Sequence, residues 1–424
     1  MDLSVEIRRI YAAVHKASAY IKFSLKWIVI ASVTGAIGGL VGAVFYKSIS
    51  FVTEIRNTNS IIILFMPIAG LIIAGIYKIT GMIKNKGTDA VIESVHSGNQ
   101  LPVLLAPDIF IGTVLTHLVG GSAGREGAAL QLGGSIGSFV GKIFRMRRDD
   151  MRMIVMCGMS AVFSALFGTP ITAAFFAMEV TAVGAMFYSG LIPCIISSSV
   201  AYAITLLLGI PPTHFDIPYV PELSAISFVK TAVLAAACAV LSVVFCILLH
   251  KTSSVFKRTF KNVYIRILAG SVLLIIMTWA VGCFDYNGAG TDIISKAISG
   301  EAKPWAFACK MIFTAVTLGC GFRGGEIVPT FFVGSTFGCA VAGFIGLEPG
   351  FGAAVGMIAL FCGVVNCPVA SVFLSVELFG SEGILLFVLA CGVSYMLSGY
   401  SGLYGSQRFA YSKFKNKSID ITTK

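Results

Sequence analysis

The residues with the clearest chemical potential are two ionisable neighbours, Arg125 and Glu126, inside the glycine-rich stretch 120–137. Long apolar segments flank this stretch on both sides. An ionisable side chain at membrane depth is costly, and one that persists usually lines an interior path. Glycines leave backbone N–H groups uncovered, and a helix that restarts after them directs its positive N-terminus back at the loop. The stretch therefore predicts a site for a small anion, with Glu126 as its titratable group.

A related block occurs in the second half of the chain. The sequence GFRGGEIVPTFFVGS from Gly321 matches GSAGREGAALQLGGS from Gly121, and it places Glu326 at the position equivalent to Glu126. Two further pairs of segments match in the same order, 87–98 with 290–301 and 159–180 with 357–378. Three matched blocks indicate an internal repeat.

The charges around the first matched pair give the relative orientation of the two halves. The block at 87–98 follows Lys84 and Lys86, whereas the block at 290–301 lies in an acidic connection. Cytoplasmic loops are enriched in lysine and arginine, so the two copies face opposite sides of a membrane. We therefore expect an inverted repeat, with the two glycine-rich blocks meeting at the midplane.

Composition supports a membrane protein. Of the 424 residues, 56% are hydrophobic and 12% are charged, against about a quarter charged in soluble domains. Several apolar segments are shorter than the ~20 residues of a perpendicular crossing and are interrupted by glycine or proline. The sequence thus predicts an all-α polytopic membrane protein, built as an inverted repeat of tilted and broken transmembrane helices.

The net charge of +11 is concentrated in four clusters, at 8–26, 142–152, 251–266 and 408–424. The positive-inside rule places both termini in the cytoplasm of a multi-pass protein of the plasma membrane, in contact with membrane lipid. So apolar a chain is not expected to bind nucleic acid.

We expect four regions along the chain. They are a basic cytoplasmic segment (1–26), a first membrane repeat (27–222), an inverted second repeat (223–412) and a short cytoplasmic tail (413–424).

Other chemistries find little support in the sequence. The 11 cysteines form no CxxC pair and have no histidine at ligand spacing, so we expect neither a metal nor another cofactor. No nucleophile–base pair is evident, so we expect no enzyme. An intramembrane enzyme that uses Glu126 and His117 is a remote alternative.

Each candidate residue also has a structural interpretation. The sole role of the glycines could be to allow close helix packing, as GxxxG does. Glu126 could pair with Arg125, although adjacent residues on a helix point apart. Glu326 could tune proton coupling or act as a neutral hydrogen-bonding group. Thr88 could be a helix N-cap, and Tyr404 an interfacial aromatic residue.

Three further buried polar residues favour structural roles. Glu179 and Glu377 occupy equivalent positions after a proline-initiated helix, so a hydrogen bond to the next loop is expected of each. His117 is expected to be packed or hydrogen-bonded more than to relay protons.

Taken together, these motifs resemble the CLC family of chloride channels and anion/proton antiporters, from about residue 30 to 412. Gly124–Gly127 is similar to the family's GREGP loop, and Gly325–Pro329 occupies the place of GIFAP. Gly87–Val91 occupies the place of GSGIP, and Tyr404 matches the tyrosine near the family's C-terminus.

The resemblance implies a homodimer in which each subunit has its own pathway, with Glu126 as the gating glutamate. Because only a short tail follows the second repeat, the cytoplasmic CBS pair of some relatives is not expected. The anion site implied by the resemblance comprises Thr88, Gly124, Arg125, Gly127, Gly325, Glu326, Ile327, Val328 and Tyr404.

Departures from the family pattern bear on the ion. Ala128 replaces the proline after GREG, and Val180 stands where many antiporters have an inner proton-carrying glutamate. Glu326 in its GGE-x-x-P context is similar to the fluoride/proton antiporter branch, whereas Thr88 and Val328 are not. The sequence thus predicts transport of small halide anions, chloride by default, coupled to protons. A fluoride/proton antiporter is the first alternative, and a passive voltage-gated-type chloride channel, favoured by Val180, is the second.

Overall fold

The computed structural model describes residues 3–423, with side chains from Ile21 onward. This part of the chain forms sixteen α-helices, three short 3₁₀ helices and three strands. The helices of the first half are α1 (Leu3–Thr58), α2 (Met66–Ile79), α3 (Thr88–Ser97), α4 (Leu105–Leu118), α5 (Glu126–Ile143), α6 (Arg148–Phe167), α7 (Pro170–Glu179) and α8 (Leu191–Leu207). Those of the second half are α9 (Ala225–Thr259), α10 (Val263–Val281), α11 (Thr291–Ile298), α12 (Ala306–Cys320), α13 (Ile327–Ile345), α14 (Pro349–Val365), α15 (Pro368–Phe379) and α16 (Ile384–Leu397). The 3₁₀ helices are η1 (Ser60–Phe65), η2 (Met82–Lys84) and η3 (Tyr188–Gly190), and the strands are β1 (Ala182–Val183), β2 (Arg408–Tyr411) and β3 (Ser418–Thr422).

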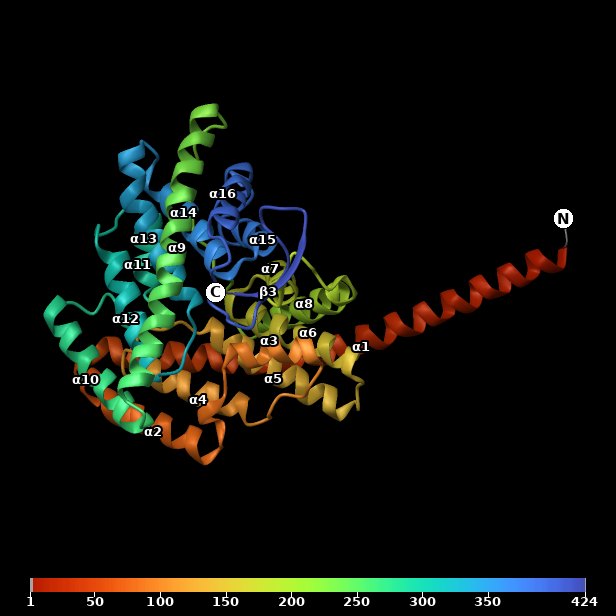
Figure 1. Cartoon of the computed structure of the whole chain (residues 1–424), viewed down its shortest axis with the longest axis horizontal. Coiled ribbons are helices and arrows are strands. Elements are labelled where there is room, and N and C mark those ends of the chain that lie inside the picture. The colour runs from red at the N-terminus through yellow and green to blue at the C-terminus, as the bar shows by residue number, and fades with distance from the viewer. Residues whose placement is uncertain (1–2, 424) are drawn as a thin grey trace.

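The two halves correspond helix by helix, α1–α8 with α9–α16. The helix pair α5 and α6 packs together as α13 and α14 do, and α7 meets α15 where the halves join. Figure 1 shows the first half, in red to yellow, beside the second, in green to blue. Seven helical segments of the described chain are long and apolar enough to cross a membrane, and five shorter apolar helices accompany them. The predicted inverted repeat of long and short helices is confirmed.

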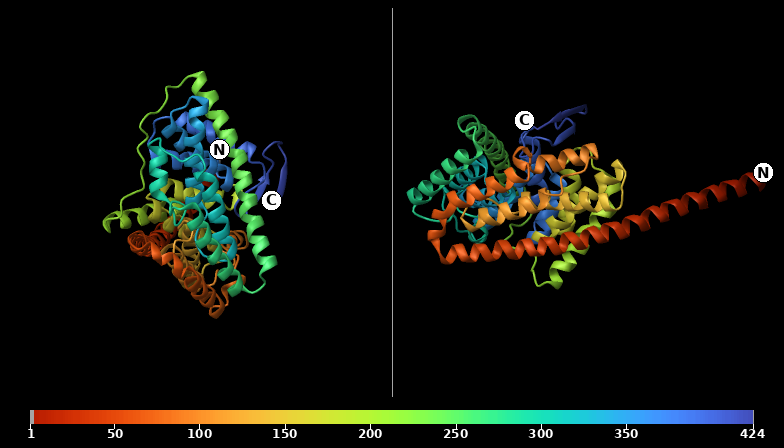
Figure 2. Two further views of the ribbon diagram at one scale, coloured as in Figure 1. Left: turned by 90° about the vertical axis from the view of Figure 1, so that its left-hand side faces the viewer. Right: turned by 90° about the horizontal axis from the view of Figure 1, so that it is seen from below.

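Helix α1 is longer than the predicted span, which began at Trp27. It runs without a break from Leu3 to Thr58, and its N-terminal part projects away from the body of the protein in Figures 1 and 2. The later part packs against α6 and α8. Residues 3–26 of the expected basic segment are therefore continuous in backbone with the first span, and the side chains of residues 1–20 lie outside the described part.

Glycines inside the helices allow close packing in both halves. A Cβ atom on Gly133 of α5 would strike the carbonyl of Gly158 on α6, and one on Gly334 of α13 would strike that of Gly356 on α14. These small residues let the helix backbones approach each other, as in GxxxG pairs. The packing interpretation is therefore right for these glycines, whereas those of the two loops have a different setting, described below.

Two carboxylates hold the halves together. Glu179, at the end of α7, accepts hydrogen bonds from the backbone N–H groups of Val369 (3.2 Å) and Ala370 (2.9 Å) in the first turn of α15. Glu377, in the last turn of α15, accepts from Ile171 (2.9 Å) and Thr172 (2.8 Å) in the first turn of α7. Each carboxylate satisfies N–H groups that a helix start leaves unpaired. The expected structural role is confirmed, but the partner is a helix of the other half, not the next loop.

The C-terminal residues pack against the first half. Strand β2 pairs in parallel with β1 and antiparallel with β3. Just before β2, the backbone N–H of Ser406 donates to Asp89 Oδ1 (2.8 Å) at the start of α3. The tail is thereby fixed beside α3, which places Tyr404 in the interior.

Candidate functional site

The two glycine-rich loops meet backbone to backbone at the centre of the protein. The N–H of Gly124 donates to the carbonyl of Gly325 and the N–H of Gly325 donates to the carbonyl of Gly124, each at 2.7 Å. Helix α5 begins at Glu126 and α13 at Ile327, each two residues after its glycine. The positive N-termini of two helices thus converge on one small volume, as the repeat predicts, which favours a small anion.

The carboxylate of Glu126 occupies the start of its own helix. Its side chain is fully buried, and Oε2 accepts a hydrogen bond from the backbone N–H of Arg125 at 2.9 Å. A Cβ atom on Gly124 would lie only 2.6 Å from that oxygen. Glycine at position 124 therefore makes room for the carboxylate, which takes the position that an anion would favour.

Arg125 forms an ion pair with its neighbour, Nε to Glu126 Oε1 at 3.4 Å. Its guanidinium also donates to the Leu166 carbonyl (3.3 Å) and lies over the Tyr46 ring, 4.4 Å from the ring centre. The expectation that residues 125 and 126 point apart is wrong. Arg125 is the N-cap and precedes the first helical residue, so the geometry of a helix interior does not apply to the pair.

Glu326 brings a second carboxylate to the junction of the loops. It is the N-cap of α13, and a Cβ atom on Gly127 would lie 3.0 Å from its Oε2 atom. Among residues 21–423, whose side chains the structure describes, no hydrogen bond or ion pair joins this carboxylate to another residue. Gly127 thus accommodates Glu326 as Gly124 accommodates Glu126.

A short polar network lies beside Gly127. Thr88 Oγ1 donates to the Gly127 carbonyl (3.3 Å), and Gln131 Nε2 donates to Thr88 Oγ1 (3.2 Å) and to the same carbonyl (3.4 Å). Thr88 is the first residue of α3 after the N-cap Gly87, so its interpretation as an N-cap is wrong. Sequence reasoning missed Gln131, which lies one helical turn after Gly127 on the same face of α5.

The remaining predicted site residues, Ile327, Val328 and Tyr404, belong to the second half of the chain. Ile327 and Val328 are buried in the first turn of α13. Tyr404 is 3% exposed, and its hydroxyl has no hydrogen-bond partner among the described residues. Its interpretation as an interfacial aromatic is therefore wrong. The structure brings Glu126 and eight of the nine predicted anion-site residues, all except Tyr404, to the junction of the two loops.

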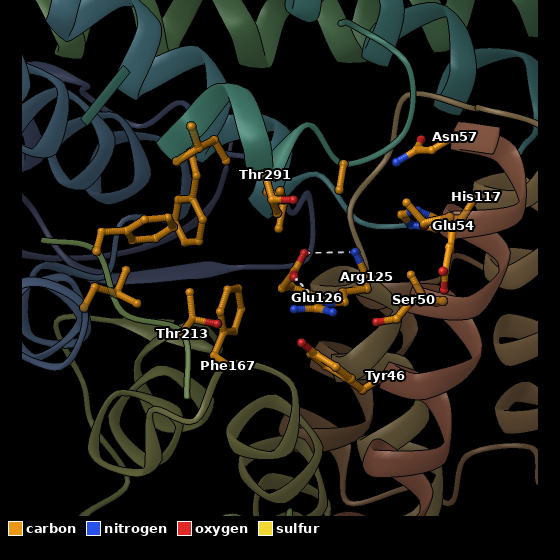
Figure 3. A pocket seen from close by; sticks show the side chains of 18 of the residues that line it. Tyr46, Ser50, Glu54, Asn57, His117, Arg125, Glu126, Phe167, Thr213 and Thr291 are labelled. Atoms are coloured by element: carbon orange, nitrogen blue, oxygen red, sulfur yellow. Dashed lines mark hydrogen bonds and ion pairs between the residues drawn. The ribbon is translucent and has the colours of Figure 1, made fainter. Parts of the chain in front are cut away.

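A cavity of about 570 Å³ reaches this junction from the α11 side. Figure 3 shows Glu126 and Arg125 at its centre, with Thr291 on one side and Tyr46 on the other. His117 also lines this α11-side cavity, and neither of its ring nitrogens has a hydrogen-bond partner in the described structure. His117 is almost fully buried, so of its two structural interpretations, packed or hydrogen-bonded, the packed one applies.

A second cavity, of about 880 Å³, opens beside α3 and is lined by Asp89, Glu93 and His96. Asp89 directly follows Thr88, so this α3-side cavity opens at the start of helix α3. By the repeat, Thr88 and Asp89 correspond to Thr291 and Asp292 on the α11 side. The two cavities therefore lie at equivalent helix starts, and the α11-side cavity reaches Glu126 at the junction.

Comparisons with known proteins agree with this arrangement. The sequence profile of the family described as "Voltage gated chloride channel" matches residues 69–399. A chloride/fluoride channel protein of Pseudomonas syringae pv. tomato is 35% identical over 395 residues, which cover 92% of this chain and 87% of that protein.

Solved structures show the same fold. The crystal structure of a CLC-type fluoride/proton antiporter superposes with a TM-score of 0.88 at 30% identity, covering 91% of this chain and 99% of that one. A slow cyanobacterial Cl⁻/H⁺ antiporter has a TM-score of 0.75 at 20% identity, with coverages of 88% and 94%. The chain belongs to the CLC family of voltage-gated chloride channels and anion/proton antiporters.

Proposed function

We propose that this protein exchanges fluoride for protons across a membrane, with Glu126 as the gate. The observation that carries the choice of ion is the second carboxylate, Glu326, at the junction of the two loops. An ionised carboxylate there repels an anion, whereas a protonated one donates a hydrogen bond. Fluoride accepts hydrogen bonds more strongly than the other halides, so it gains most from that donor. The names of two relatives, a chloride/fluoride channel protein and a fluoride/proton antiporter, point the same way.

The proposed gating role of Glu126 rests on the position of its carboxylate. Its carboxylate lies at the N-terminus of α5 and faces the α11-side cavity, so it competes with an anion for the same dipole. Protonation removes its charge and weakens both its hold on the helix start and its ion pair with Arg125. The neutral side chain can then leave the anion position and carry a proton toward the cavity.

Chloride is the second candidate. Thr88 presents a hydroxyl group beside the loops, and Val328 is apolar. Both residues depart from the fluoride branch that the sequence otherwise resembles.

The membrane placement is part of the proposal. Both termini and the basic clusters at 142–152 and 251–266 face the cytoplasm of the plasma membrane. The α3-side cavity is then cytoplasmic and the α11-side cavity external. Each subunit of a homodimer contains one pathway.

The test uses purified protein in liposomes that are loaded with fluoride or chloride. An outward anion gradient is imposed, and anion efflux and internal pH are recorded together. Uphill proton movement driven by fluoride is expected, with weaker or no movement driven by chloride. Chloride-driven movement of equal size would favour the second candidate, and anion efflux with no proton movement would favour a passive channel.

The Glu126→Gln variant tests the gate in the same vesicles. The neutral amide cannot titrate, so anions are expected to pass while proton movement is lost. Glu54→Gln is the matched control, because Glu54 lines the same cavity but has an exposed side chain, whereas that of Glu126 is fully buried. Proton coupling that survives in Glu126→Gln would remove Glu126 from the mechanism.

A further inference from the structure

The connection between α5 and α6 carries a cationic surface that takes no part in the ion pathway. Residues 142–152 include two acidic side chains, and both are paired. Asp150 Oδ2 lies 2.6 Å from Lys26 Nζ, and Asp149 Oδ1 lies 3.8 Å from Arg152 Nη1. Four exposed basic side chains of this connection form no ion pair among the described residues; they are the basic patch, Lys142, Arg145, Arg147 and Arg148. The patch therefore keeps its positive charge for a partner of opposite sign.

Helix α1 passes directly beside this patch. It contacts both α5 and α6, and the ion pair of Lys26 with Asp150 fixes α1 against the start of α6. At this point α1 leaves the body of the protein, as Figure 1 shows. The patch and one face of α1 thus form a single surface.

An apolar groove of about 500 Å³ lies between α1 and the end of α5. It is lined by Leu25, Lys26, Val29, Ile30 and Phe144. Of these, Leu25, Val29 and Phe144 are exposed by 57%, 59% and 48%. Phe144 directly precedes Arg145 in the sequence. The groove therefore begins beside the basic patch.

Apolar side chains continue from the groove along both helices. On α1, Val33 and Ile37 follow Val29 at intervals of four residues, so they share its face, and both are exposed. Phe139 and Ile143 of α5 are exposed as well. Because α1 is long and apolar enough to cross a membrane, this stripe leads from the patch toward the interior of the bilayer.

We propose that the basic patch and the groove together bind one anionic phospholipid. Its phosphate lies among the four cations, and an acyl chain lies in the groove. Basic clusters beside a membrane-spanning helix attract anionic headgroups, and burial of the chain removes apolar surface from water. An acidic peptide would match the cations but leave the groove uncovered, whereas a neutral lipid would fill the groove without matching the charge. The inference depends neither on the transported ion nor on proton coupling.

The alternative is that the patch only determines topology, as the positive-inside rule describes. The second basic cluster provides the comparison, because Lys257 and Arg258 are exposed in the last turn of α9. If charge alone attracted anionic lipid, both clusters would contribute equally. A lipid site at the patch makes binding depend on Arg145 and Arg147, and also on the groove.

The experiment measures lipid retention by the whole chain in detergent micelles that contain phosphatidylglycerol and phosphatidylcholine in equal amounts. Native mass spectrometry counts the bound lipids. The double variant Arg145→Gln/Arg147→Gln tests the patch, and Lys257→Gln/Arg258→Gln is its matched control. Val29→Trp fills the groove. Ile28→Trp is the control for that change, because Ile28 is exposed on the same helix but does not line the groove.

Wild type is expected to retain phosphatidylglycerol in preference to phosphatidylcholine, and less of it at high salt. One lysine or arginine near an anionic lipid contributes about fivefold in affinity. We therefore expect Arg145→Gln/Arg147→Gln to bind phosphatidylglycerol roughly 25-fold more weakly. Val29→Trp should also lose the lipid, while both controls should bind it as wild type does.

Three results would overturn this inference. They are equal retention of the two lipids by wild type, unchanged retention by Arg145→Gln/Arg147→Gln, and the same loss in Lys257→Gln/Arg258→Gln. The first comparison needs no substitution, so it stands even if a variant folds poorly. Fluoride flux in liposomes is a separate measurement, and its absence would overturn the proposed function without changing the lipid result.

Discussion

Glu179, at the end of α7, binds the first turn of α15, and Glu377, in the last turn of α15, binds the first turn of α7. The two carboxylates form a reciprocal pair across the two halves of the chain. Each replaces the water that would otherwise satisfy two N–H groups of a helix start. The relationship links helix α7 to α15 independently of the ion site.

Removing either carboxylate of this reciprocal pair should lower the stability of the folded protein and leave its ion selectivity unchanged. Glu179→Ala and Glu377→Ala should each cost about 1–3 kcal/mol, because each leaves two N–H groups of a helix start without their acceptor. The measurement is the loss of folded protein on heating in detergent, followed by fluorescence-detected gel filtration. Glu382→Ala, in the exposed loop before α16, is the control and should unfold as wild type does. Equal melting of all three variants would contradict the capping role.

A second prediction concerns the contact between the loops. A Cβ atom on Gly325 would strike the backbone nitrogen of Gly127, so Gly325→Ala must push the two helix starts apart. We expect anion flux to fall to the background of empty vesicles. Gly343→Ala, on the same helix α13, is the control because no atom lies within 4 Å of the added methyl group. Normal flux through Gly325→Ala would show that the close approach of the loops is dispensable.

A third prediction concerns ion selectivity. Glu326→Ile removes the carboxylate beside Gly127 and should lower the ratio of fluoride to chloride flux by roughly tenfold, which corresponds to about 1.4 kcal/mol. The ratio is measured by ion-selective electrodes on the same vesicle preparation. Glu348→Gln is the control, since that carboxylate caps α14 and accepts the Phe351 N–H. A ratio that does not change in Glu326→Ile would leave Glu326 a structural residue.

A fourth prediction concerns the network at Gly127. Gln131→Met keeps the approximate size of the side chain but removes two hydrogen bonds, to Thr88 Oγ1 and to the Gly127 carbonyl. A hydrogen bond of this kind contributes about 1 kcal/mol, so we expect slower anion flux in a folded protein. Gln100→Met, an exposed glutamine of the α3-side cavity, is the control. Flux at the wild-type rate in Gln131→Met would exclude Gln131 from the pathway.

The sequence predicted the centre of this site well, because its signals are local. The glycines around Glu126 and their copies around Glu326 indicate two helix starts, and the repeat predicts that they meet. The contact of Arg125 with Glu126 was considered but disfavoured, because the rule for helix faces assumes that both residues are helical. Gln131 was missed because its role depends on where Thr88 lies in space.

The hydrogen-bond partners of Glu179 and Glu377 also could not be predicted from the sequence. Each glutamate occurs in an apolar segment, and nothing in its local pattern distinguishes a bond to the next loop from a bond to a distant helix. The choice depends on the packing of α7 against α15, which is a property of the whole fold.

The paired hydrogen bonds between Gly124 and Gly325 also bear on the synthesis of the protein. A ribosome that has completed α8 has already produced Glu126, but the residue that braces its loop has not yet been translated. The first eight helices alone therefore contain Glu126 without the second loop against which its own loop packs. The junction of the two loops can form only when α13 has been inserted.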